Sequence, residues 1–139
     1  MVEWEVCLSE AGYRITASRR AVMAVLIQDN APLSPQEILE QARAVHAGLG
    51  LVTVYRTLNL LTDLDLVRRI HREDGCHGYV LASPGHHHAV ICHNCGRAVE
   101  FTGKNDIDAL IAQVERRTGY RVDDHLLQLS GLCPDCQRR

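Results

Sequence analysis

The sequence is poor in aromatic residues and has no long apolar run, and both absences narrow the possibilities. One Trp, one Phe and four Tyr stand among 139 residues, so a folded core has to come mainly from Leu, Val, Ile and Ala. No stretch approaches the roughly 20 apolar residues that span a bilayer. Residues 1–12 carry acids and lack the apolar run of a signal peptide. We therefore expect a cytoplasmic protein with no membrane association.

Cysteine and histidine are plentiful by contrast. The chain has six cysteines and eight histidines, and most of the histidines fall between His71 and His88. In a reducing cytoplasm, clustered cysteines bind metal or take part in redox chemistry more often than they form disulfides. A chain of this length is one average domain or two small ones, and small domains often depend on a metal or a partner chain. Metal binding is therefore the first question.

The net charge of −2 argues weakly against nucleic acid, but the distribution of charge matters more than its sum. Residues 11–28 contain three arginines and no acid, and residues 41–62 contain two arginines and no acid. These windows fit either a basic surface for nucleic acid or ordinary solvated helix faces.

The first half of the chain, up to about Leu66, is predicted to be helical. Thr16 is expected to cap one helix, and Ser34, Pro35 and Glu37 have the pattern of a capping box at the start of another. A third helix is expected from residue 51, where apolar residues at i, i+4 and i+7 form a buried face and leave others outward: Val54, Leu58 and Leu61 inward, and Tyr55, Arg56 and Asn59 on other faces. This succession of helices is typical of a helix-turn-helix domain.

The periodicity changes after Leu66. Residues 66–70 and 78–81 are predicted strands around a turn at 73–75, which would add a wing to the helix-turn-helix. Residues 83–85 have the composition of a hinge. The remainder is predicted as β-β-α-β, with strands at 90–92 and 98–101, a helix from 107 to about Gly119, and a strand over 122–129. The expected fold class is α+β.

Two CxxC motifs carry the strongest chemical signal. Cys92 and Cys95 form the first, Cys133 and Cys136 the second, with residues 96–132 between them. Four thiolates complete the closed tetrahedral shell of a structural Zn²⁺. A single CxxC could be a redox pair, but two that bracket a β-α-β unit favour zinc. Because no coordination position stays open, this zinc is expected to stabilise the fold rather than to catalyse a reaction.

Three consecutive histidines precede the first CxxC motif. In an extended segment, residues i and i+2 share a face and the middle residue points away, so His86 and His88 can serve one metal site and His87 another. His125 and Asp108 would complete the first of these as a site for Zn²⁺, Fe²⁺ or Mn²⁺. The alternative is a polar hinge with a hydrogen-bonded surface histidine at 125.

A further group of possible ligands lies in the wing. Cys76 and His77 follow its turn, and His71 precedes it. With His87 facing them, they would form a sensory metal site, but a free thiol beside exposed histidines explains the same pattern. Cys7 has no partner pattern and is predicted to be a packed residue of the first helix.

Taken in order, these segments resemble the ferric-uptake-regulator family of bacterial metalloregulators. Residues 13–19 are similar to its Arg-x-Thr-x-x-Arg segment, and residues 52–58 are similar to its recognition-helix signature. Residues 86–101 resemble its histidine cluster, first CxxC motif and following strand, and the second CxxC motif completes the match. The resemblance covers nearly the whole chain, and the ordered set is specific although no single motif is decisive.

The resemblance implies a repressor that binds operator DNA as a homodimer when a sensory site holds a divalent metal, Fe²⁺ or Zn²⁺, and so controls metal-uptake genes. It implies a winged-helix DNA-binding domain over residues 1–82, a hinge at 83–88, and a dimerisation and zinc-binding domain over 89–139.

The same resemblance assigns roles to individual residues. Tyr55 and Arg56 match the family's DNA-contacting pair, with Thr53 in the same signature, and Arg19 matches its phosphate-contacting arginine. Four residues fall where the family has a second metal site, with Asp in place of the usual Glu: His86, His88, Asp108 and His125.

The sensory site departs from the family pattern. Many members carry a second histidine at the position of Ala89, a carboxylate or thiolate near residues 80–82, and a histidine where this chain has Ala31 and Pro32. His87 keeps one matching ligand, and the nearest replacements are the wing residues named above. A sulfur ligand would favour Zn²⁺ over Fe²⁺, which points towards the zinc-uptake-regulator branch.

Three other functions fit parts of the pattern. A zinc hydrolase or deaminase is disfavoured, because no Glu stands beside the histidines as a general base and no HExxH or HxE motif is present. A peroxide sensor of the same fold would use bound Fe²⁺ to oxidise a ligand histidine. A zinc-stabilised protein-interaction module would have no role on DNA. The first of these would be an enzyme, whereas the regulator is not.

Overall fold

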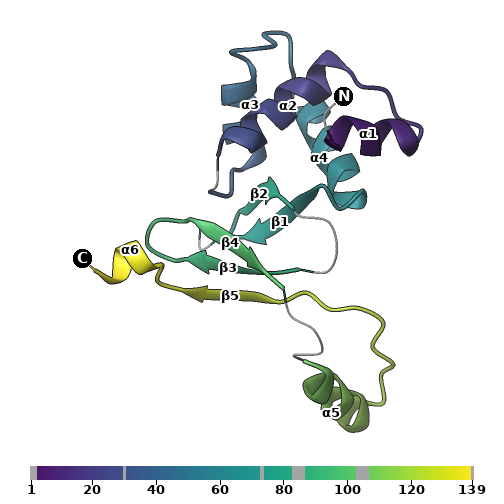
Figure 1. Cartoon of the computed structure of the whole chain (residues 1–139), viewed down its shortest axis with the longest axis vertical. Coiled ribbons are helices and arrows are strands. Elements are labelled where there is room, and N and C mark those ends of the chain that lie inside the picture. Colours follow the sequence, from purple (N-terminus) through teal and green to yellow (C-terminus); the bar gives the residue numbers. More distant parts are fainter. Residues whose placement is uncertain (1–2, 30, 73, 83–86, 103–106, 139) are drawn as a thin grey trace.

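The computed structural model describes residues 3–29, 31–72, 74–82, 87–102 and 107–138 (Figure 1). Its N-terminal part has the elements α1 (Glu3–Glu10), α2 (Ala17–Gln28), α3 (Pro35–Ala42), α4 (Leu51–Asp63), β1 (Val67–His71) and β2 (His77–Leu81). Its C-terminal part has β3 (His88–Cys92), β4 (Ala98–Phe101), α5 (Asp108–Thr118), β5 (Gln128–Gly131) and α6 (Pro134–Gln137). The fold class is α+β, as the sequence predicts.

Side-chain caps fix the starts of α2 and α3. The hydroxyl of Thr16 accepts a hydrogen bond from the backbone N–H of Arg19 at 3.2 Å. At α3, Ser34 accepts from the Glu37 N–H at 3.2 Å, and the Glu37 carboxylate accepts from the Ser34 N–H at 2.8 Å. This is a complete capping box with Pro35 in the first turn. Both predicted helix starts are confirmed.

The core of the N-terminal part lies where α1, α2, α3 and α4 meet. Val54, Leu58 and Leu61 of α4 are fully buried, as their spacing predicts. They pack with residues of the other three helices, among them Leu8, Val22, Leu26 and Ile38. The opposite face of α4 is exposed. Cys7 is half-buried in α1. Packing therefore presents one side of α4 to solvent on a rigid helix-turn-helix support.

The hairpin of β1 and β2 forms the wing. The two strands pair antiparallel, from Val67 opposite Leu81 to His71 opposite His77, close to the predicted ranges. Tyr79 also pairs through its backbone with Leu33, just before α3. Arg72 forms ion pairs with Glu37 and Asp74. These contacts tie the wing to the helices.

Gly78→Ala should lower the free energy of unfolding, because β2 packs closely on the segment before α3. A β-carbon at residue 78 would overlap the β-carbon of Pro32 and lie 3.0 Å from its carbonyl carbon. Overfilling a packed site typically destabilises by about 1–3 kcal/mol, which chemical denaturation measures. Gly48→Ala is the control, since a β-carbon there meets nothing within 4 Å. Equal stabilities for the two variants would contradict the close packing at Pro32.

The C-terminal sheet has the order β4-β3-β5, with β3 antiparallel to β4 and parallel to β5. β3 and β4 confirm the predicted strands. The strand predicted over residues 122–129 is wrong in its bounds, because β5 begins only at Gln128. Before it, side chains take up backbone N–H groups: Glu115 accepts from Val122, and Asp124 accepts from the His125 N–H. Residues 122–126 therefore connect α5 to the sheet, which begins with the Leu127 carbonyl that accepts from the Ala89 N–H.

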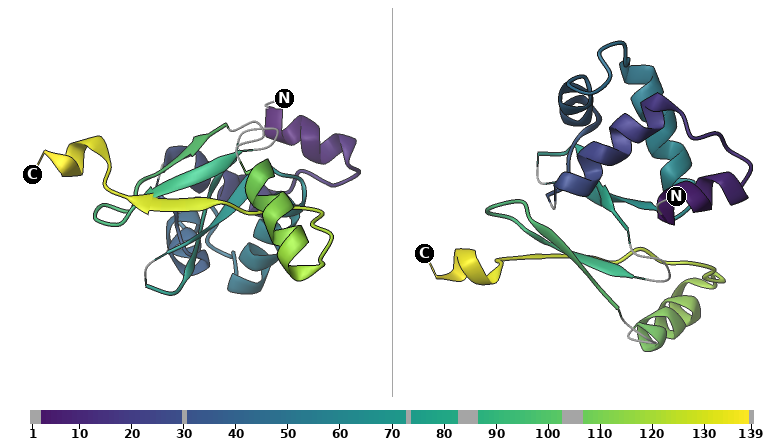
Figure 2. Two further views of the ribbon diagram at one scale, coloured as in Figure 1. Left: turned by 90° about the horizontal axis from the view of Figure 1, so that it is seen from below. Right: turned by 45° about the horizontal axis from the view of Figure 1, so that its top comes forward.

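Helix α5 confirms the predicted helix and ends at Gly119, whose φ of 76° is the left-handed cap that glycine adopts readily. None of its described residues is buried, and in Figure 1 and the right view of Figure 2 it stands apart from the strands. The short helix α6 begins at Pro134. The sequence patterns did not predict this helix. No helix in the described part of the chain is long and apolar enough to cross a membrane.

A second, smaller core joins the two parts of the chain. It consists of Ile70 and Val80 from the wing and Ala89 and Ile91 from β3, all buried and packed on one another, with Ala98 of β4 beside them. We call these four buried residues the junction cluster. Figure 1 and the right view of Figure 2 show the hairpin between the helices and the three-stranded sheet. Apolar packing thus links the wing directly to the sheet that carries the first CxxC motif.

Candidate metal centres and nucleic-acid surface

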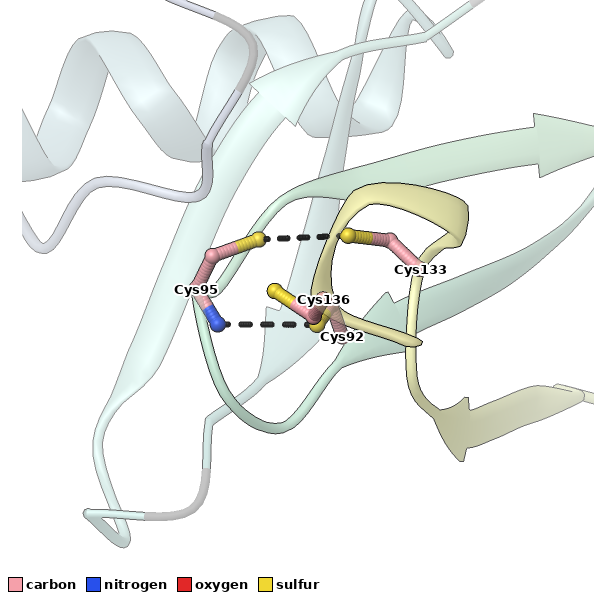
Figure 3. Close-up of side chains that lie close together, drawn as sticks. All are labelled: Cys92, Cys95, Cys133 and Cys136. Carbon is pink, nitrogen blue, oxygen red and sulfur yellow. Dashed lines mark hydrogen bonds between the residues drawn. The ribbon is translucent and has the colours of Figure 1, made fainter. Parts of the chain in front are cut away.

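The four cysteines of the CxxC motifs come together at one end of the C-terminal sheet. Cys92 ends β3, Cys95 lies in the following turn, and Cys133 and Cys136 cap and occupy α6. Figure 3 shows the side chains converging from these two segments. The four sulfur atoms lie within 4.8 Å of one another. The parallel pairing of β3 with β5 brings the motifs together, because both strands end at the same edge of the sheet.

The geometry fits a tetrahedral zinc ion. A Zn–S bond of about 2.3 Å in a tetrahedral shell places neighbouring sulfurs about 3.8 Å apart. The Cys95 and Cys133 sulfurs are 3.8 Å apart already. Surrounding polar groups donate hydrogen bonds to the sulfurs. The Asn94 amide donates to the Cys136 sulfur at 3.3 Å, and the Cys95 N–H donates to the Cys92 sulfur at 3.5 Å. Donors of this kind orient and stabilise thiolate ligands.

The surroundings also separate the pKa values of these thiols. Backbone N–H groups, that of Cys95 first, lower the pKa of Cys92 to about 5, and the N–H of Cys136 lowers the pKa of Cys133. The Asn94 amide lowers the pKa of Cys136, but the neighbouring thiols and burial outweigh it and raise that pKa to about 11. Full ionisation of the set therefore needs a cation among the sulfurs, and a bound metal supplies it.

Two of the four residues predicted for a second metal site lie side by side. The rings of His88 and His125 have centroids 5.4 Å apart, and His88 is buried at the start of β3 against Phe101. Asp108 lies exposed in the first turn of α5, and His86 lies outside the described residues. Within the described residues, the four cysteines are the one group of three or more ligands whose atoms already converge. This second site stays a prediction.

The predicted sensory residues divide into two places. His71 and His77 face each other across the wing with ring centroids 6.0 Å apart, next to the exposed Cys76. His87 lies instead near β4, with its Nδ1 3.8 Å from a carboxylate oxygen of Glu100. Sequence reasoning missed Glu100; its signal was a lone acid in the apolar strand 98–101. The four predicted residues do not form a converged ligand group among the described residues.

The candidate nucleic-acid surface is the outward face of α4. Tyr55 and Arg56 are exposed, Thr53 is half-exposed, and the Thr57 hydroxyl donates to the Thr53 carbonyl inside the helix. Arg19 in α2 contacts the segment between α1 and α2. Its guanidinium donates to the Arg14 carbonyl at 2.6 Å and lies 5.8 Å from the centre of the Tyr13 ring. The structure thus leaves Tyr55 and Arg56 exposed on α4 and holds Arg19 in a defined position.

Comparisons with known proteins agree with this architecture. The model of the family described as "Ferric uptake regulator family" matches residues 10–130. The ferric uptake regulation protein of Campylobacter jejuni is 31% identical over 134 residues, which cover 95% of this chain and 85% of that protein. The peroxide operon regulator of Bacillus subtilis is 30% identical, with 95% and 90% covered. A zinc uptake regulator complexed with zinc and DNA shares the fold with a TM-score of 0.82 at 22% identity, covering 98% of this chain and 91% of that one.

Proposed function

The chain belongs to the ferric uptake regulator family, and we propose that it represses metal-uptake genes by binding their operator DNA when its regulatory site holds a divalent metal. Members of the family are metal-dependent transcription repressors, and the relatives named above are regulators rather than enzymes. We place the protein in the cytoplasm, where such a repressor meets DNA.

The observation that carries this proposal is the exposed face of α4. Tyr55 and Arg56 project from a helix whose other side is locked into the core by Val54, Leu58 and Leu61. The major groove of DNA admits an α-helix, and an arginine side chain on that helix recognises guanine. Arginines elsewhere on the protein anchor phosphates. The wing beside it supplies the second element of a winged-helix DNA-binding unit.

Footprinting of the DNA beside the protein's own gene tests this directly. Protein stripped of its regulatory metal and protein loaded with Zn²⁺ or Fe²⁺ would be compared on the same fragment. A protected segment that appears with metal supports the proposal. Protection at no segment with either metal would contradict it.

We propose two kinds of metal site in addition to the DNA surface. The four cysteines hold structural Zn²⁺, supported by their converged sulfurs. A second divalent metal, Zn²⁺ or Fe²⁺, binds regulatory sites. The pairing of His88 with His125 supports one that also uses His86 and Asp108. The wing group His71, Cys76 and His77 and the hinge residue His87 are the proposed sensory ligands, and these need rearrangement to converge.

The proposed domain division is 1–82, 83–88 and 89–139, with the last domain forming a homodimer. The support is the apolar surface that the C-terminal part leaves uncovered. Leu110 is 57% exposed and Leu126 is 95% exposed, and further exposed apolar residues accompany them: Val99, Val114, Leu129 and Leu132. Large apolar side chains that stay exposed on the sheet, and on a helix that buries none of its own residues, are typical of a protein interface.

Replacing Leu110 and Val114 together by Glu should convert the dimer to a monomer. Both lie on α5 and would bring charges into the proposed interface, and unpaired charges are strongly disfavoured in a desolvated contact. Sedimentation velocity at micromolar concentration measures the change. Val45→Glu is the control, because Val45 is 72% exposed, more than either α5 residue, and lies in the N-terminal part. A double variant that sediments as the wild type does would contradict the assignment of this face.

A peroxide response is the second candidate, favoured by the 30% identity to a peroxide operon regulator. In that case, bound Fe²⁺ and peroxide would add an oxygen atom to a ligand histidine, with His88 and His125 the nearest pair. Mass spectrometry of the iron-loaded protein after peroxide treatment separates the two functions. Unmodified histidines and unchanged DNA binding would contradict a peroxide response, and metal sensing would remain the one proposed function.

A further inference from the structure

Arg68 crosses the boundary between the two parts of the chain. It lies on β1 of the wing, and its Nη2 is 3.8 Å from Oε2 of Glu100 on β4. His87 approaches the same oxygen, with its Nδ1 also 3.8 Å away. The three side chains are 21%, 16% and 15% exposed, respectively. One carboxylate oxygen is therefore shared by an imidazole from the hinge and a guanidinium from the wing.

The position of Arg68 follows from the strand pairing. Arg68 is opposite Val80 in the hairpin, and Val80 and Ile70 belong to the junction cluster. Since alternate residues of a strand share a face, Arg68 points towards the C-terminal sheet together with Ile70. Its neighbour Arg69 is opposite Tyr79, on the face that packs towards the helices, and is exposed.

The apolar surroundings strengthen the contact between these charges. The junction cluster is almost fully buried, and an ion pair beside such a surface is less screened than one in water. The Arg68 Nε is buried and has no hydrogen-bond partner among the described residues. Among the charged groups of the described residues, Glu100 is the one within ion-pair distance of the Arg68 guanidinium.

We propose that Arg68 lowers the affinity of His87 and Glu100 for a divalent metal, because its guanidinium occupies the Glu100 carboxylate that the metal ion needs. An imidazole and a carboxylate are two donors that Zn²⁺, Fe²⁺ and Mn²⁺ accept, so His87 and Glu100 can serve a cation together. Arg68 is a cation of the chain itself at the same oxygen. A metal ion at Glu100 must displace the guanidinium or bind against its positive charge, and either effect weakens binding.

The same contact helps to hold the wing on the sheet. A second polar contact lies at the other edge: the Gln128 side chain accepts from the His71 N–H at 3.0 Å and donates to the His71 carbonyl at 2.8 Å. The junction cluster fills the space between them. Because one guanidinium serves both roles, loading the hinge with metal is coupled to the contact between the wing and β4.

Arg68→Gln is the direct test, and this part of the proposal rests on the proposed metal-sensing function. The protein keeps zinc at its four cysteines, and Co²⁺ is titrated as a spectroscopic probe of the hinge. Removal of one like charge beside a partly buried site should tighten Co²⁺ binding by about tenfold. Arg69→Gln, which removes the same charge from the opposite face, should bind as the wild type does. Equal Co²⁺ affinity for both variants would overturn the proposal.

Small-angle X-ray scattering of the protein without metal at His87 and Glu100 provides an independent readout. Arg68→Gln should enlarge the radius of gyration relative to wild type and Arg69→Gln, because the wing loses its contact with Glu100. Exchange of the two charges, Arg68→Glu with Glu100→Arg, should restore the wild-type value. An Arg68→Gln protein as compact as wild type would contradict the docking role. Absence of Co²⁺ binding in every variant would instead contradict the proposed sensory site, whatever the scattering shows.

Discussion

Cys136→Ser should unfold the C-terminal part of the protein and abolish its dimer. Cys136 is buried, and its sulfur lies among the other three and accepts a hydrogen bond from Asn94. The cysteine cluster joins the β3–β4 turn to α6, segments that are far apart in the chain. Loss of a ligand removes most of the zinc-binding free energy, which in small zinc domains is folding free energy on the order of 10 kcal/mol.

The change is measured by zinc content, thermal unfolding and sedimentation of the same sample. We expect loss of bound zinc, loss of the C-terminal transition and a monomeric or aggregated species. Cys7→Ser is the matched control, because Cys7 is a half-buried cysteine of α1 that belongs to neither the cluster nor the proposed sensory site. If the variant that lacks all four cluster cysteines remained a dimer with the native melting curve, the cluster would not be a structural zinc site.

Arg56→Ala and Tyr55→Ala should each weaken operator binding by about ten- to a hundredfold, as expected for the loss of about 1–3 kcal/mol of base recognition. Both side chains are exposed on α4 and contribute nothing to its buried face. Zinc content and oligomeric state should therefore remain as in the wild type. Fluorescence anisotropy with operator DNA and with a scrambled sequence separates loss of recognition from general loss of affinity.

Arg19→Ala provides the contrasting case within the same experiment. A phosphate contact carries no sequence information, so this variant should bind operator and scrambled DNA more weakly by a similar factor, with a salt dependence reduced by about one charge. Arg117→Ala is the charge-matched control on α5, away from α4. Unchanged operator affinity in both α4 variants would show that the DNA surface lies elsewhere.

Local sequence patterns predicted much of the fold because local physics decides those features. The capping box at Ser34 needs only residues three apart, and the buried stripe of α4 needs only helical periodicity. The end of α5 at Gly119 follows from the backbone freedom of glycine. The convergence of the two CxxC motifs was also predictable, because paired CxxC motifs are typical of a structural zinc site with four cysteine ligands.

The start of β5 was not predictable in the same way. Val122, Leu127 and Leu129 have strand-like character, yet side chains of Glu115 and Asp124 take up backbone groups before Gln128. These competing hydrogen bonds depend on where α5 ends in space. The contact of Arg68 with Glu100 was hidden for a related reason, since it depends on the register of one hairpin and on its docking against another sheet.

The affinity for operator DNA, measured with and without a divalent metal in the regulatory sites, tests metal-dependent repression most directly. Fluorescence anisotropy at one fixed salt concentration would compare the two states of a protein whose four cysteines keep their zinc throughout. A metal-linked change of conformation typically couples two sites by about 1–3 kcal/mol, so we expect metal to tighten binding by roughly ten- to a hundredfold. Equal affinities in the two states, with the regulatory metal shown to be bound, would contradict a metal-dependent repressor.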